Sequence, residues 1–276
     1  MKQIPNIFTL LNLFFGCLAI VFILQNNFLY LVVDQDSQLL HPYALVNAPE
    51  KIYWASAFIG IAAIIDFLDG LVARMLNFSS EMGKQLDSLA DVVSFGVAPG
   101  MIIYQFLRLA YAQQQDGMDV SAFWLLPAFI VPCAGAFRLG RFNLDKEQSY
   151  GFKGVPIPAA GLLIASFPLI YWYSDSALAV RLLLSPWFWY ALIAVTAYLM
   201  VCTLPMMALK FKGLSFKNDL PKFILLAVAV IAGIIFHWLA VPVVFVAYVA
   251  LSLAMPEYAK GDKTTTGGHL STDIAS

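Results

Sequence analysis

Long apolar stretches run through almost the whole chain, and short polar segments separate them. A membrane-spanning helix needs about 20 mostly apolar residues. The last two stretches are separated only by the region of His237 and Trp238, with Pro242 just beyond, and we interpret them as a helical hairpin. The pattern predicts an all-α, polytopic transmembrane helical bundle with about eight spans, at residues 4–24, 53–76, 92–111, 123–142, 155–173, 187–207, 223–238 and 239–255.

Residues 1–256 are therefore expected to form a single membrane domain, and two segments are expected to lie outside its bundle. Residues 26–50 contain Asp34, Asp36 and Glu50 but no Lys or Arg, which predicts an external loop with a short interfacial helix at 28–33. Residues 257–276 are rich in Thr and Gly and predict a disordered cytoplasmic tail.

The composition supports a membrane protein. Of the 276 residues, 61% are hydrophobic and only 12% are charged, whereas soluble domains carry roughly 25% charged residues. A net charge of −1, without a dense run of Lys or Arg, argues against nucleic acid as a partner. The lipid bilayer is the expected surroundings, and the aromatic run 187–190 is interpreted as part of an interfacial belt.

The positive charges alternate between successive loops, as expected for a protein with a cytoplasmic and an external side. This pattern predicts that both termini are cytoplasmic. A single Lys precedes the first apolar stretch and no small-residue cleavage pattern follows it, which predicts a retained anchor and not a signal peptide. We expect the protein in the inner (cytoplasmic) membrane. The external side holds only Lys51, Arg108 and Arg181. The predicted cytoplasmic side holds Lys2, Arg74, Lys84, Arg138, Arg141, Lys146, Lys153, Lys210, Lys212, Lys217, Lys222, Lys260 and Lys263.

Four aspartates lie close together in sequence around the second and third apolar stretches. Asp66 and Asp69 are three residues apart, and Asp87 and Asp91 are four apart, so each pair shares one face of its helix. The polar segment 77–81 predicts a turn that folds the two helices antiparallel. The expected result is a cluster of four carboxylates.

Such a cluster at membrane depth requires a counter-charge, because like charges repel and burial disfavours ionised groups. Oxygen ligands without His or Cys suit Mg²⁺ or Mn²⁺, and two such ions are a common device for phosphoryl transfer. Arg74 could hold a phosphate oxygen, while Gly70 and Gly83 permit close approach of a ligand or a neighbouring backbone. The structural alternative is buried Asp–Arg pairs that only fix helix packing.

The aspartates belong to a longer pattern, D-x2-D-G-x2-A-R-x8-G-x3-D-x3-D, and the chain matches it without a gap or substitution. This pattern resembles that of the CDP-alcohol phosphotransferase family. The resemblance implies a homodimeric membrane enzyme that transfers a phosphatidyl or similar group from a CDP-linked donor to an alcohol. It also implies a role for each matching residue: metal ligands at Asp66, Asp69 and Asp87, a ligand and general base at Asp91, and a CDP pocket lined by Gly70, Ala73, Arg74 and Gly83.

Further stretches resemble the bacterial phosphatidylserine synthase branch of that family. They are PNIFTLLN at 5–12, SLADVVSFGVAPG at 88–100, AFRLGRFN at 136–143 and GFKGVPIPAAG at 151–161. The chain departs from that branch at Gly140, where alanine is expected, and in the insertion at 26–50. This resemblance implies CDP-diacylglycerol and L-serine as substrates, with phosphatidylserine and CMP as products.

Each remaining candidate residue has a functional and a structural interpretation. Arg138 and Arg141, three apart, could bind a serine carboxylate or a lipid phosphate, or be ordinary positive-inside residues. Lys153 could meet phosphate or be a solvated loop lysine. By resemblance, three polar residues of the first span contact the cytidine nucleotide, although helix packing explains them equally well; they are Asn6, Thr9 and Asn12.

Three other functions remain open from the sequence. The same chemistry could use another acceptor, such as glycerol 3-phosphate or an inositol phosphate. A cation or proton-coupled carrier could use the aspartates as a relay. A non-catalytic scaffold is disfavoured, because nothing structural requires four intramembrane carboxylates.

Overall fold

The computed structural model describes residues 4–25, 29–32, 43–46, 51–75, 80–113, 120–144, 152–207 and 220–255. The segment 257–276, for which the sequence predicts a disordered tail, and most of the predicted external loop lie outside the described residues.

Helices make up nearly all of the described chain, as the all-α prediction requires. They are α1 (Ile4–Leu24), α2 (Ile52–Met75), α3 (Glu81–Asp91), the π-helix η1 (Val92–Val97), α4 (Ala98–Ala112), the 3-10 turns η3 (Ala122–Trp124) and η4 (Leu126–Phe129), α5 (Ile130–Leu144), α6 (Ile157–Tyr173), α7 (Ala177–Leu183), α8 (Pro186–Val201), α9 (Leu220–Phe236), the 3-10 turn η6 (His237–Leu239) and α10 (Ala240–Ala254). Two short antiparallel pairs are the only strands among these residues: β1 (Leu29–Val32) with β2 (Tyr43–Val46), and β3 (Phe152–Lys153) with β4 (Pro205–Met206).

The protein is a multi-pass membrane protein. Within the described residues, five helical segments are long and apolar enough to cross a membrane, and a sixth is added if α7 and α8, bent by 76°, form one span. The predicted count of about eight spans is therefore not confirmed. One reason is length, since α6 has 17 residues and α10 only 15, fewer than the roughly 20 that an untilted span needs. Another is that α9, η6 and α10, which cover the last two predicted spans, form one continuous helical segment, Leu220–Ala254.

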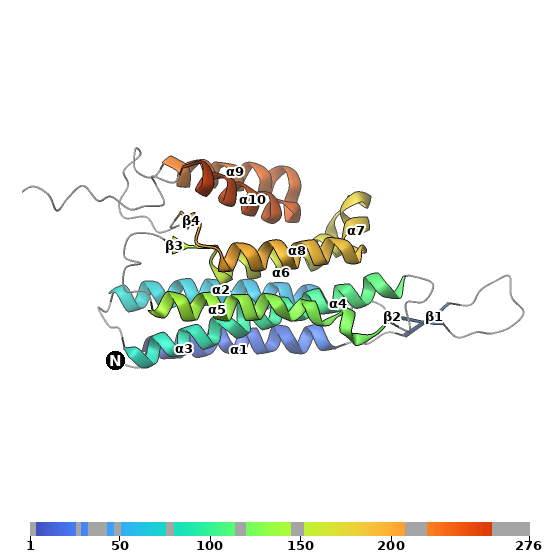
Figure 1. Ribbon diagram of the computed structural model, residues 1–276, viewed down its shortest axis with the longest axis horizontal. Coiled ribbons are helices and arrows are strands. Elements are labelled where there is room, and N and C mark those ends of the chain that lie inside the picture. Colours follow the sequence, from blue (N-terminus) through green and yellow to red (C-terminus); the bar gives the residue numbers. More distant parts are fainter. Residues whose placement is uncertain are drawn as a thin grey trace, which may run out of the picture.

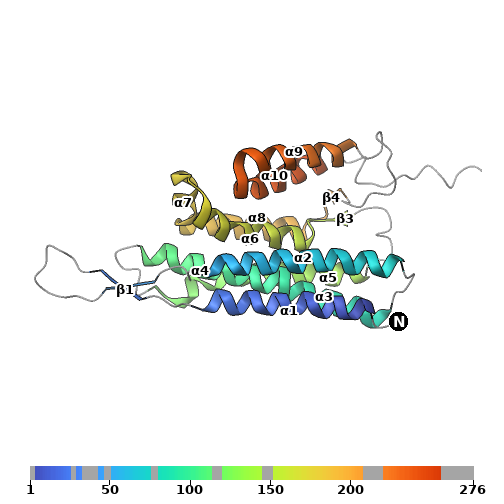
Figure 2. The same ribbon diagram turned by 180° about the vertical axis from the view of Figure 1, so that it is seen from behind.

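The helices run along a common direction in layers (Figures 1 and 2). Helices α1 to α5 form a bundle, and α6 and α8 pack on one side of it through contacts with α2, η1, α4 and α5. The α9–α10 hairpin lies on the far side of α6 and α8, where α10 contacts α6. The start of α1, the end of α2, the start of α3 and the β3–β4 pair lie at the same end of the molecule (Figure 1), which we call the site end.

The helical hairpin predicted near the C-terminus is confirmed. Helices α9 and α10 pack against each other and lie side by side in both views (Figures 1 and 2). The chain reverses at η6, where His237 has a φ of 50°. His237 thus terminates α9 with a left-handed residue, a role that Gly or Asn more often fills.

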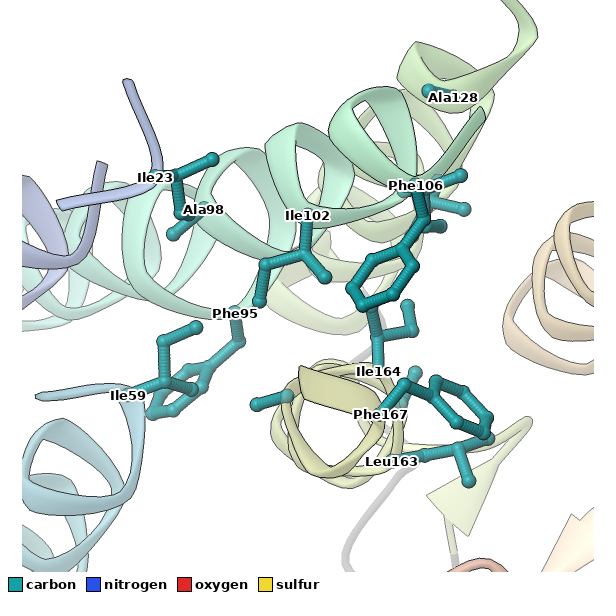
Figure 3. Close-up of a cluster of buried hydrophobic side chains, with 14 of the residues drawn as sticks. Ile23, Ile59, Phe95, Ala98, Ile102, Phe106, Ala128, Leu163, Ile164 and Phe167 are labelled. Atoms are coloured by element: carbon teal, nitrogen blue, oxygen red, sulfur yellow. The ribbon is translucent and has the colours of Figure 1, made fainter. Parts of the chain in front are cut away.

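The core surrounds the continuous segment η1–α4. Phe95, Ile102 and Phe106 project from it toward side chains of α1, α2 and α6 (Figure 3). Gly161 of α6 permits this approach, because a Cβ there would lie 2.8 Å from the Phe95 carbonyl oxygen. Small residues favour such close packing in membranes. The hydrophobic effect does not drive helices together in lipid, so helix association depends on van der Waals contact between them.

Two interpretations from the sequence need correction. In the aromatic run 187–190, Trp187 is exposed, but Trp189 is fully buried, stacks on Phe106 and donates from Nε1 to the Leu183 carbonyl at 2.8 Å. It belongs to the core because its helix face meets α4 and α6. Likewise, the expected interfacial helix near 28–33 is wrong: residues 29–32 form strand β1, whose backbone groups pair with β2.

Candidate active site

A short connection joins the two motif helices, α2 and α3. Ser80 is the N-cap of α3: its Oγ accepts a hydrogen bond from the Gly83 backbone N–H at 2.9 Å, and Glu81 follows in the first turn. Both features stabilise a helix start, because they satisfy an unpaired backbone N–H and complement the helix dipole. Helix α2 ends and α3 begins at the site end (Figure 1), so the two run in opposite directions, as the sequence predicts.

This arrangement brings three of the four motif aspartates together. Asp66 from α2 and Asp87 and Asp91 from α3 each offer a carboxylate oxygen, and these oxygens all lie within 4.8 Å of one another. Asp91 is buried, with 7% of its surface exposed, and the other two are half-buried. We call this group the carboxylate triad.

Asp69 is also buried but is not a member of the triad. Its Oδ2 accepts a hydrogen bond from the hydroxyl of Thr9 on α1. Thr9 is buried too, with 3% exposed. This hydrogen bond offsets part of the cost of burying the Asp69 carboxylate.

Asn12, one turn after Thr9 on the buried side of α1, connects this helix to the triad. Its Nδ2 donates to Asp91 Oδ1 at 3.3 Å, and its backbone carbonyl accepts from the Ser94 hydroxyl at 3.0 Å. Asn12 is 1% exposed, and its Oδ1 has no hydrogen-bond partner among the described residues. An unpaired buried acceptor beside a carboxylate indicates a place for a donor from a ligand or a water molecule.

Ser94 is a contributor that the sequence did not single out. It is the third residue of the π-helix η1, which begins directly after Asp91. Gly16 of α1 packs so closely on Ser94 that a Cβ added to Gly16 would lie 2.3 Å from the Ser94 Oγ. Short π-helical segments are frequent at functional sites. The one available signal was its position within the resembling stretch 88–100, but a π-helix cannot be recognised from periodicity.

The residues expected to line a CDP pocket are spread along both motif helices. Gly83 faces Asn6: a Cβ on Gly83 would lie 3.3 Å from the Asn6 Oδ1. Gly70 is exposed, with open space where its Cβ would be. Ala73 and Arg74 belong to the last turn of α2, but their side chains lie outside the described part of the structure.

The two arginines predicted to bind the acceptor have different surroundings. Arg138 on α5 is 5% exposed, its Nε has no hydrogen-bond partner in the described chain, and it lies within electrostatic range of Asp91. Arg141 instead donates from both Nη atoms to carbonyls at the end of α8, to Val201 at 2.8 Å and Cys202 at 3.1 Å. Two of its five N–H groups thus stabilise a helix C-terminus.

Lys153 lies on β3, opposite Pro205 of β4, and is exposed. Gly154 follows with a φ of 77°, and its backbone N–H donates to the Leu204 carbonyl at 2.9 Å. The carbonyl oxygens of Met200, Cys202 and Leu199 would lie 2.6, 2.9 and 3.0 Å from a Cβ on Gly154. Position 154 therefore accepts only glycine, because its positive φ and its contact with the end of α8 leave no room for a side chain.

The triad has the donor set of a hard divalent cation. Three carboxylates held this close, one of them buried, repel one another unless positive charge neutralises them. Oxygen ligands of this kind suit Mg²⁺, Ca²⁺ or Mn²⁺ and not the softer metals. The geometry thus fits a metal centre that lies beside a buried cationic side chain, Arg138.

Comparisons with known proteins identify the family of the chain. The family model for CDP-alcohol phosphatidyltransferase matches residues 2–207, a range that includes the triad, Asn12, Arg138 and Lys153. The chain is thus a membrane-embedded member of the CDP-alcohol phosphatidyltransferase family, in which dependence on a divalent metal is general.

Similar curated proteins are named more narrowly. CDP-diacylglycerol–serine O-phosphatidyltransferase of Helicobacter pylori J99 is 35% identical over 162 residues, which cover 58% of this chain and 54% of that protein. The protein of that name from Bacillus subtilis is 32% identical over 177 residues, covering 62% and 78%, and the one from Saccharomyces cerevisiae is 40% identical over 131 residues, covering 44% of each. The alignment thus spans about half the length of the Helicobacter relative.

Proposed function

We propose that this protein transfers the phosphatidyl group of CDP-diacylglycerol to the hydroxyl of L-serine and releases CMP. The observation that carries the proposal is the carboxylate triad, formed by the family motif at the site end of the bundle. The printed names of the bacterial and yeast relatives support serine as the acceptor.

In this proposal, two divalent ions, Mg²⁺ or Mn²⁺, bind at the triad together with Asp69. When bound, they supply positive charge to the phosphate oxygens on which negative charge develops. Thr9 and Asn12 orient Asp69 and Asp91 through the hydrogen bonds described above. Gly70, Ala73, Arg74, Gly83 and Asn6 line the pocket for the CDP group.

Asp91 acts as the general base. It removes the proton of the serine hydroxyl, the serine oxygen forms a bond to the lipid-side phosphorus, and the bond from this phosphorus to the CMP oxygen breaks. CMP leaves with the bonding electrons. Burial of Asp91 keeps competing water away from the carboxylate during this step.

The acceptor carboxylate pairs with Arg138. A buried guanidinium with an unpartnered Nε, within electrostatic range of Asp91, offers charge-assisted hydrogen bonds to a carboxylate. Arg141, with three N–H groups beyond those bonded to α8, and Lys153 add positive charge to the same acceptor side of the site.

We further propose that the site end faces the cytoplasm and that the protein is a homodimer in the inner membrane. Of the described cations, Lys84, Lys153 and Lys222 belong to elements or element starts at the site end, and Arg138 and Arg141 belong to the C-terminal half of α5, which ends there. Lys51, Arg108 and Arg181 belong to elements at the opposite end. This asymmetry supports the orientation, because cytoplasmic loops carry an excess of Lys and Arg.

The test is CMP release by purified protein in detergent, with CDP-diacylglycerol and Mg²⁺ or Mn²⁺, in the presence and absence of L-serine. We expect strict dependence on serine. Release only with glycerol 3-phosphate or an inositol phosphate would replace serine as the acceptor, and absence of release with every alcohol would overturn the enzymatic proposal in favour of a carrier.

The variant Asp91→Asn tests the assigned base. We expect it to lower CMP release about a hundredfold or more, the usual contribution of a general base, while CDP-diacylglycerol still binds. The matched control is Asp175→Asn, because Asp175 is exposed at the other end of the bundle. Equal activity in the two variants would remove Asp91 from the mechanism.

A further inference from the structure

The segment from the end of α8 through β4, residues 199–207, contacts two of the three cationic residues assigned to the acceptor side of the site. Arg141 donates to the carbonyls of Val201 and Cys202. Lys153 pairs with Pro205, and the backbone of its neighbour Gly154 bonds Leu204. A shift of this segment would therefore move both cations.

The α9–α10 hairpin holds this segment from the other side. Tyr248 on α10 donates from its hydroxyl to the Met207 carbonyl at 3.1 Å, and the Met207 backbone N–H donates to the Ser252 Oγ at 3.2 Å. Tyr248, Ser252 and Met207 are 4%, 1% and 2% exposed. Both backbone polar groups of one buried residue are thus satisfied by two side chains of α10.

These two side chains are unusual on their helix. Tyr248 and Ser252 are four residues apart and share one face, whereas the rest of α10 is almost wholly apolar. Lipid contact or simple hydrophobic packing would be served by apolar residues here. The hydroxyls therefore indicate that α10 fixes the position of Met207 rather than merely covering it.

Tyr248 also lies within electrostatic range of Arg138. Around it, Val155, Met206, Met207 and Leu225 form a small apolar core that is separate from the main one. The match to the family model ends at Met207. The hairpin thus lies beyond the matched region. It hydrogen-bonds the last residue of that region, Met207, near the acceptor side of the site.

We propose that Tyr248 and Ser252 are positioning residues for acceptor binding, and that the α9–α10 hairpin sets the affinity for the acceptor by holding residues 204–207 and the adjoining cationic side chains. This inference rests on the proposed function, since it concerns the acceptor subsite of the same active site. It assigns a role to an element outside the matched region.

The experiment compares Tyr248→Phe and Ser252→Ala with wild type in the CMP-release assay, with serine and CDP-diacylglycerol varied separately. We expect the KM for serine to rise about five- to tenfold in each variant, as expected for loss of one buried hydrogen bond. The kcat and the KM for CDP-diacylglycerol should change less than twofold. Tyr198→Phe is the matched control, because Tyr198 is 66% exposed on α8.

A role limited to helix packing predicts a different result. Tyr248→Phe would then lower the thermal unfolding temperature in detergent and reduce the amount of active protein without changing the KM for serine. That outcome, or equal effects on both substrates, would overturn the inference.

The two proposals fail in distinguishable ways. If wild-type CMP release requires another alcohol, serine is wrong as the acceptor, and the same comparison made with that alcohol decides whether Tyr248 positions the acceptor. If wild-type protein releases no CMP with any alcohol, there is no acceptor to position and both proposals fall.

Discussion

Asn12 provides the sharpest test of how the carboxylate triad is held. Its Nδ2 donates to Asp91 at 3.3 Å, and the residue is 1% exposed. Asn12→Ala removes this donor and leaves the Asp91 carboxylate without it in a buried position. Asn12→Asp keeps the size of the side chain but replaces the donor with a further negative charge.

The expected loss follows from the kind of bond removed. A hydrogen bond to a charged group contributes about 1.5–3 kcal/mol, and each 1.36 kcal/mol corresponds to tenfold in rate. Asn12→Ala should therefore lower kcat/KM for CMP release by roughly 10- to 150-fold. Asn12→Asp should lower it further at low Mn²⁺ concentration, because a fourth carboxylate repels Asp91 unless a cation is bound.

The assay is CMP release in detergent as a function of Mn²⁺ concentration. Gln25→Ala is the control, since Gln25 is exposed just beyond the opposite end of α1. We expect the Mn²⁺ concentration for half-maximal activity to rise in Asn12→Ala and to stay at the wild-type value in the control. Unchanged activity and unchanged Mn²⁺ dependence in Asn12→Ala would refute the positioning of Asp91 by Asn12.

Three further variants test the packing and the pocket. Gly161→Val should prevent stable folding or lower the unfolding temperature sharply, because even a Cβ would lie 2.8 Å from the Phe95 carbonyl; a normal thermal unfolding curve would contradict this. Gly70→Ala should leave that curve unchanged, since nothing lies within 4 Å of the added Cβ, and should raise the KM for CDP-diacylglycerol if Gly70 lines the pocket. Arg141→Lys should lower the free energy of unfolding by about 1–3 kcal/mol, because Lys cannot reproduce the two bonds to α8; chemical denaturation that gives the wild-type midpoint would contradict it.

The sequence by itself determined the class of the protein and its chemical centre. Long apolar stretches require helices in lipid, because a bilayer offers no water to satisfy free backbone groups. The spacing of Asp66, Asp87 and Asp91, with a polar turn between their helices, predicted the cluster that the structure contains. These features are local, since they depend only on helical periodicity and on one short connection.

Contacts between distant segments were decided only by the tertiary structure. Periodicity places Asp66 and Asp69 on one face of α2, but Asp69 bonds Thr9 on α1 while Asp66 meets the triad. In the same way, Arg138 and Arg141 share a face, yet one is buried near Asp91 and the other bonds the end of α8. A helical period defines a face, whereas the neighbour that covers each residue on that face depends on how remote helices pack. For the same reason, the hydrogen bond from Tyr248 to Met207 was not apparent from the sequence.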